Sequence, residues 1–118
     1  MDLRLTLQSQ NELVVHLQEG AVATTVAVPG ARAGAESLTR AVDDVVAHGY
    51  GECFWPALEG GHYWWMFRRD GDSMEVVTMW SRGGASGWEH VFRALDSVAW
   101  VRERLDAEVG RLGLNVSR

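Results

Sequence analysis

The stretch "GGHYWWMFRRDGDSMEVVTMW", residues 60–80, decides the fold because its pattern is that of a β-hairpin with the turn in the middle. Asp70 and Gly71 supply the two positive-φ residues that a type I′ turn requires. We therefore predict two antiparallel strands joined by this two-residue loop. The predicted pairs are Arg69 with Asp72, Phe67 with Met74, Trp65 with Val76 and Tyr63 with Thr78.

Strand alternation then sorts the large side chains onto two faces. One face is dense enough to be a core face and carries Tyr63, Trp65, Phe67, Met74, Val76 and Trp80. The other is half apolar and half polar and carries His62, Trp64, Met66, Arg68, Ser73, Glu75, Val77 and Met79. A three-residue bulged turn would instead divide the large apolar residues evenly between the faces. We favour the two-residue turn because it leaves one clear core face.

The same logic extends to the preceding strand, "ECFWPAL" at residues 52–58. A tight turn at Gly60-Gly61 would pair this strand with residues 62–69. It would place Phe54 and Leu58 on the core face and Cys53 and Trp55 on the mixed face. Pro56 cannot donate a hydrogen bond to a β-ladder, so we expect an edge or bulged strand.

The mixed face is the candidate binding site. On this register its apolar centre comprises Trp55, Trp64, Met66, Val77 and Met79, and its margin comprises Cys53, His62, Arg68 and Glu75. Exposed large side chains inside a polar margin are typical of partner or ligand sites. Trp100 is a further candidate anchor, since it lies about 100° from the apolar stripe of its predicted helix. Alternatively, the tryptophans form a second core layer.

The remaining elements follow from apolar periodicity. The first thirty residues predict three strands, and helices are predicted over residues 34–48 and 97–112, the second capped by Asp96. Residues 52–95 predict four strands, including the hairpin. The order βββα-ββββα, with hairpins dominant, predicts an α+β fold: a mainly antiparallel sheet of about six or seven strands with two helices packed on one face. We expect a single domain over residues 1–113 and a frayed tail over 114–118.

Composition excludes several classes of function. The 118 residues include sixteen acidic side chains and eleven basic ones, all of them arginine, so neither Schiff-base chemistry nor a P-loop lysine is available. The net charge of −5 repels phosphate backbones and argues against nucleic acid as a partner. No apolar run is long enough for a bilayer span, so we expect no membrane partner. The alternating N-terminus does not resemble a signal peptide, which favours a cytoplasmic protein. Arginine without lysine suggests a GC-rich bacterial genome.

Catalytic chemistry is not indicated either. No nucleophile–base spacing, metal cluster or cofactor motif is present, so we expect no catalytic residue, no metal and no cofactor. The leading hypothesis is a non-enzymatic protein-interaction module, such as an immunity protein or a regulatory binding protein, whose partner is another protein or its own copy in a homodimer. The alternative is a small-ligand-binding protein or minor enzyme with a Trp-lined pocket and His62, Arg68 and Glu75 as polar groups. A deep pocket at Trp55 and Trp64 would favour that alternative.

Overall fold

The structure is a computed structural model that describes residues 1–9, 11–83 and 86–114. Its elements in chain order are β1 (Asp2–Gln8), β2 (Glu12–Glu19), β3 (Val22–Pro29), α1 (Ala31–His48), β4 (Tyr50–Pro56), β5 (His62–Asp70), β6 (Ser73–Ser81), β7 (Glu89–Ser97) and α2 (Val98–Arg111). The predicted α+β class, element order and antiparallel pairing are confirmed. The seven strands form two sheets, of order β1-β2-β3 and β4-β5-β6-β7.

The three-stranded sheet forms because its strands place apolar residues opposite one another. Leu5 pairs with Val15, which in turn pairs with Val26. All three side chains are fully buried, because one face of this sheet packs against the helices. The alternating charged and polar residues of β1 point the other way, as strand periodicity requires.

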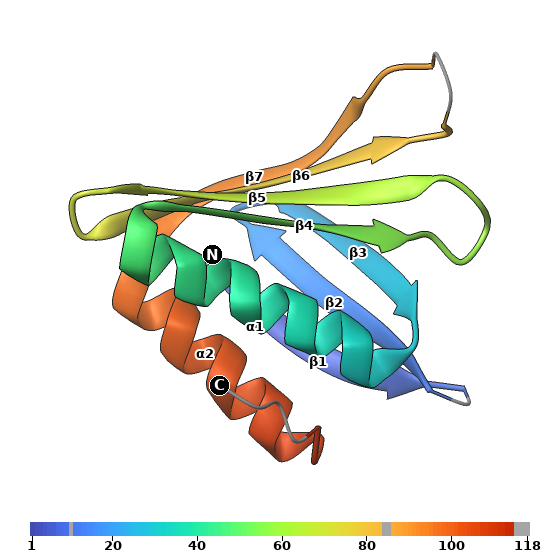
Figure 1. The fold of residues 1–118 in the computed structure, drawn as a ribbon, viewed down its shortest axis with the longest axis horizontal. Coiled ribbons are helices and arrows are strands. Elements are labelled where there is room, and N and C mark those ends of the chain that lie inside the picture. Colours follow the sequence, from blue (N-terminus) through green and yellow to red (C-terminus); the bar gives the residue numbers. More distant parts are fainter. Residues whose placement is uncertain (10, 84–85, 115–118) are drawn as a thin grey trace.

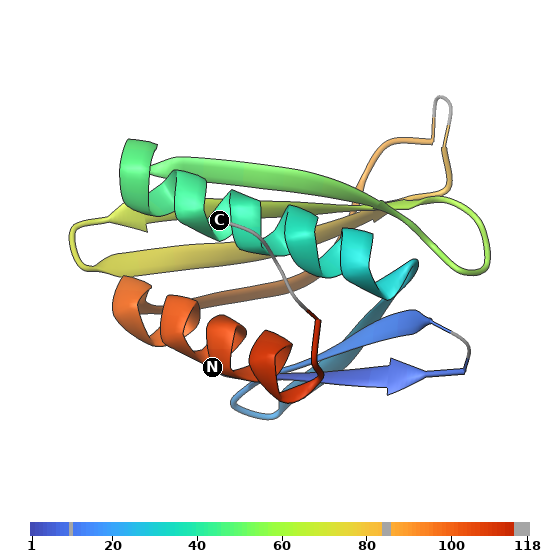
Figure 2. The same cartoon turned by 60° about the horizontal axis from the view of Figure 1, so that its bottom comes forward.

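The four-stranded sheet forms a separate layer, and both helices lie on one side of it (Figure 1). The two helices pack side by side, with β1 next to α2 (Figure 2). Leu38, Val42 and Val45 of α1 are buried, as are Val101 and Leu105 of α2. Figure 1 shows no helix or strand of the described chain on the other face of the four-stranded sheet. None of the helices in residues 1–9, 11–83 and 86–114 is long and apolar enough to cross a membrane.

The side chains of the β5–β6 hairpin lie on the predicted faces, but the two strands pair in a different register. Phe67 pairs with Val76, whereas the predicted turn paired it with Met74. The loop consists of Gly71 and Asp72, of which only Gly71 has a positive φ, at 61°. A type I′ turn over this loop would need a positive φ at Asp72 as well, and Asp72 does not have one. The shift is by two residues and leaves each side chain on its predicted face. The buried members are Trp65, Phe67, Met74 and Val76.

The predicted tight turn at Gly60-Gly61 is wrong. β4 and β5 are joined by a loop of residues 57–61, in which the Ala57 N–H donates to Gly61 O (3.0 Å). Trp55 consequently pairs with Tyr63, not with Met66. The longer loop changes the register by an odd number of residues, which exchanges the two faces of β4.

The exchanged faces of β4 and the longer loop together move four predicted side chains. Cys53 and Trp55 are buried among the core residues, with 8% and 1% of their surfaces exposed. Phe54 and Leu58, expected in the core, are 54% and 43% exposed. The prediction that β4 is an edge strand is confirmed, since β4 is the first strand in its sheet.

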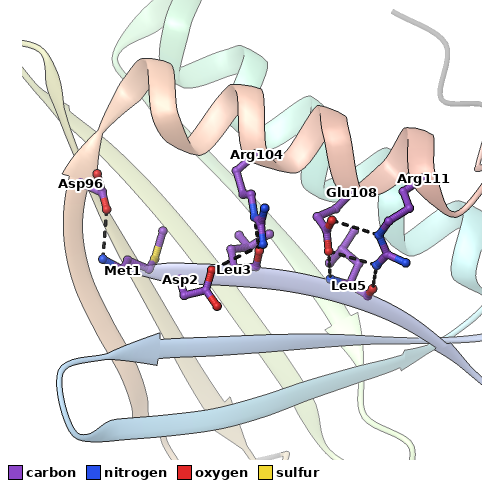
Figure 3. A network of polar contacts seen from close by, with 8 residues as sticks. All are labelled: Met1, Asp2, Leu3, Leu5, Asp96, Arg104, Glu108 and Arg111. Carbon is purple, nitrogen blue, oxygen red and sulfur yellow. Dashed lines mark hydrogen bonds and ion pairs between the residues drawn. The ribbon is translucent and has the colours of Figure 1, made fainter.

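The free edge of β1 is covered by polar side chains of α2 (Figure 3). The carboxylate of Glu108 accepts a hydrogen bond from the backbone N–H of Leu5 (2.9 Å). Arg104 donates to Leu3 O (2.8 Å), and Arg111 donates both to Leu5 O and to Glu108. Unpaired backbone groups at a sheet edge are a template for aggregation, and these three side chains occupy them.

The second helix is capped by Ser97, and the predicted cap at Asp96 is wrong. The Ser97 hydroxyl accepts a hydrogen bond from the Trp100 N–H (2.9 Å). Asp96 instead binds the amino group of Met1 at 3.0 Å (Figure 3). Of the tail predicted over residues 114–118, Leu114 is described, and its N–H donates to Val109 O (3.1 Å). Residues 115–118 lie outside the described part of the chain.

Candidate functional site

The centre of the uncovered sheet face is a block of four apolar side chains. Trp64 and Met66 of β5 pair with Met79 and Val77 of β6, respectively. All four point away from the helices, because each neighbours a buried residue in its strand. All four are half-buried. The structure therefore brings together the apolar residues that the hairpin pattern had placed on this face.

Two aromatic residues that the sequence prediction omitted extend this block. Phe54 of β4 is stacked on Trp64, with ring centroids 5.6 Å apart and ring planes at 19°. Trp88, just before β7, lies 5.3 Å from Trp64 and 6.2 Å from Phe54 between ring centroids. Phe54 is 54% exposed and Trp88 is 41% exposed. We call this surface the outer aromatic face, comprising Phe54, Trp64, Met66, Val77, Met79 and Trp88.

Charged side chains lie beside the apolar centre and already make hydrogen bonds or ion pairs within the chain. Glu52 accepts hydrogen bonds from the indole N–H of Trp64 and from the hydroxyl of Tyr50, both at 2.8 Å. Burial, assisted by the Glu52 carboxylate, raises the pKa of Tyr50 to about 12, so this hydroxyl stays a hydrogen-bond donor at neutral pH. The bond from Trp64 to Glu52 holds the Trp64 ring in place within the cluster.

A second glutamate organises the part of the margin nearest the β5–β6 turn. Glu75 binds Arg68 at 3.1 Å and Arg93 at 2.6 Å, one arginine on each neighbouring strand. The two arginine side chains are 69% and 58% exposed, whereas the Glu75 side chain is only 18% exposed. The predicted margin residues Arg68 and Glu75 thus lie beside the aromatic centre. His62, also predicted for the margin, is exposed at the start of β5.

Two predicted site residues lie elsewhere. Trp55 packs edge-on against Trp65 in the core, with ring centroids 5.2 Å apart, and its indole N–H donates to the Ser37 hydroxyl (2.8 Å). Its burial removes it from the candidate surface. Trp100 is half-buried in α2 and packs against the core from the helix side. It is separate from the outer aromatic face.

The site offers no reactive thiol. Cys53 is buried, and desolvation raises the pKa of its thiol to about 12, so the thiolate is scarcely populated at neutral pH. It pairs with Trp65 in the sheet and does not lie opposite Arg68 as predicted. Among the described residues, no three His, Cys, Asp or Glu side chains form a group that could hold a metal ion.

The sequence contains a signal that could have placed Phe54 on the solvent-facing side of β4. Glu52 lies two residues before it and must share its strand face, and a charged side chain marks the solvent side of a half-buried strand. The sequence contains no such signal for Trp88. The pairing of β6 with β7 shifts between Thr78 and Met79, and this irregularity changes which side of β7 faces solvent.

Comparison with models of protein families, with curated proteins and with solved structures finds no match to this chain.

Proposed function

We propose that this chain is a non-enzymatic protein-interaction module that binds through the outer aromatic face. The observation that supports this is the cluster of Phe54, Trp64 and Trp88 on a sheet face that no described helix or strand covers. Solvent-exposed aromatic clusters are rare on monomers because they leave much apolar surface in water. Tryptophan is also enriched among the residues that dominate binding energy.

The composition of the face also supports a protein partner. Half-buried apolar residues lie at its centre and charged residues at its margin, the usual anatomy of a protein interface. The charged groups of the margin are satisfied within the chain, because Glu75 binds both arginines and Glu52 accepts from Trp64 and Tyr50. Polar groups of a catalytic or small-ligand site usually converge instead on the space that the ligand occupies.

The occupant that we favour is a second copy of the chain. The margin carries two glutamates, Glu52 and Glu75, and two arginines, Arg68 and Arg93, and so has no net charge. The whole chain has a net charge of −5, so two copies repel each other over most of their surfaces. A neutral, apolar face is where two such chains meet with the least repulsion.

Sedimentation velocity over about 1–500 µM tests this proposal, since it covers the range of ordinary homodimer affinities. We expect a concentration-dependent dimer, and Phe54→Ser or Trp88→Ser should weaken it about 30-fold, the effect of losing an aromatic hot spot. Val22→Ser is the matched control, because Val22 is 57% exposed in the other sheet. A wild-type protein that stays monomeric at the highest concentration would contradict a second copy as the occupant.

A further inference from the structure

A groove of about 490 Å³ lies where the three-stranded sheet meets the four-stranded sheet. It is formed by β3, by the β4–β5 loop and by the ends of β5, β6 and β7. Its volume is within the range of small-molecule sites, about 300–1,000 Å³. We call it the sheet-junction groove and define it by Thr25, Leu58, Glu59, Tyr63, Trp80 and Glu89.

The floor of the groove is an aromatic pair. Tyr63 and Trp80 are cross-strand partners, and both are half-buried. Tyr63 precedes Trp64 in β5, so the groove opens on the side of the sheet opposite the outer aromatic face. Leu58 and Val91 add apolar walls.

Two glutamates line the groove beside this floor. Glu89 pairs with Trp80 in β7, and Glu59 lies in the loop beside Tyr63. Burial raises the pKa of Tyr63, and the negative charge of Glu59 raises it further, which places that charge near the phenol. None of the described residues that line the groove is basic, although the chain contains eleven arginines.

These polar groups have unused bonding capacity. Among the described residues, neither carboxylate makes a hydrogen bond or an ion pair, which contrasts with Glu52, Glu75 and Glu108. Negative charge beside electron-rich ring faces favours a cation. Because both rings offer apolar surface, the favoured cation also has an apolar body.

We propose that the sheet-junction groove binds an organic ammonium ion, with its charge between Glu59 and Glu89 and its alkyl groups on Tyr63 and Trp80. The source of this chemistry is either a free alkylammonium or the lysine side chain of another protein, since this chain has no lysine. The inference does not depend on the outer aromatic face, because the two surfaces share no residue.

Titrations followed by the indole N–H signal of Trp80 in NMR spectra test the proposal. The probes are choline, its neutral carbon analogue 3,3-dimethylbutan-1-ol, and acetyl-lysine methylamide. We expect saturable shifts with at least one of the two cations and binding about tenfold weaker with the neutral analogue, because the analogue loses both ion pairing and cation–π attraction. Tighter binding of choline would identify a free cation, and tighter binding of the blocked lysine would identify a protein side chain. Either outcome supports the ammonium site.

Separate variants test whether the two carboxylates bind the cation. Glu59→Gln together with Glu89→Gln should weaken the cation about tenfold, whereas Glu103→Gln, the same kind of change at an exposed position of α2, should leave binding unchanged. Phe54→Ser should also leave it unchanged, which separates this site from the proposed dimer face. The proposal is overturned if no cation shifts the Trp80 signal at about 20 mM, or if the neutral analogue binds equally well.

Discussion

At the scale of single residues, two adjacent tryptophans have opposite environments. Trp65 is fully buried between the rings of Trp55 and Phe67, at 5.2 and 6.0 Å between centroids. Trp64 is half-buried on the outer face and stacks on Phe54. The difference follows from strand alternation alone, so the two positions test which face is the core.

Trp65→Ala should lower the free energy of unfolding by about 3–5 kcal/mol, because it leaves a large cavity in the core. Trp64→Ala should cost clearly less, since water already reaches part of this side chain, but it should weaken association through the outer aromatic face. Urea unfolding of both variants at one low concentration measures the difference. Equal losses would show that both faces are core, and the proposed face would then lose its basis.

The residue-scale pattern explains which predictions could be made from the sequence. The faces of β5 and β6 were predictable because any shift by an even number of residues leaves them unchanged, and the actual shift is two. The faces of β4 were not, because residues 57–61 contain two adjacent glycines that fit either a tight turn or the longer loop. The length of the β4–β5 loop therefore decides that Phe54, and not Trp55, lies on the outer aromatic face.

At the scale of elements, α1 and β4 approach each other closely. α1 ends at His48, Gly49 turns the chain with a φ of 86°, and β4 runs back along the helix. Gly51 lies so near the helix that a Cβ there would be 1.9 Å from the carbonyl oxygen of Ala41. Backbone atoms cannot yield as a flexible side chain does, so this position admits only glycine.

Gly51→Ala should therefore destabilise the protein by about 3 kcal/mol, the upper end of overpacking costs. Gly110→Ala is the matched control within a helix. A Cβ at position 110 would meet no other described part of the chain within 4 Å beyond the backbone of its own helix, so this change should stabilise by up to about 1 kcal/mol. Circular dichroism melts of the two variants provide the comparison. An unchanged midpoint for Gly51→Ala would mean that α1 and β4 separate readily.

At the scale of the whole molecule, the fold joins the two ends of the described chain. Glu108 is 6% exposed and links α2 to Leu5, 103 residues earlier. Such long-range polar contacts leave no periodic pattern in the sequence. The strand β1 and the helix α2 could therefore be predicted, but the hydrogen bond between Glu108 and Leu5 could not. The hydrogen bond from Arg111 holds the pKa of Glu108 below its usual value, and burial opposes this shift only in part.

A lowered pKa in the folded state fixes the direction of the pH effect. The stabilisation by Glu108 is fully present above the pKa of the unfolded chain, near the ordinary value of 4.5, and is lost as the pH falls through the lower folded value. Glu108→Gln should therefore cost about 1–2 kcal/mol at pH 7, because the amide can still accept from Leu5 but no longer carries the charge that pairs with Arg111.

The difference between wild type and Glu108→Gln should shrink as the pH falls below 4.5, because the unfolded wild-type chain then takes up a proton, and it should disappear once the folded carboxylate is protonated as well. Urea midpoints at pH 7, 5 and 3 measure it, with Glu103→Gln on the exposed side of the same helix as a control that should follow wild type at every pH. A penalty that persists undiminished at pH 3 would show that shape, not charge, makes Glu108 fit against β1. The contact between Glu108 and β1 would then depend on its fit and on the hydrogen bond from Leu5.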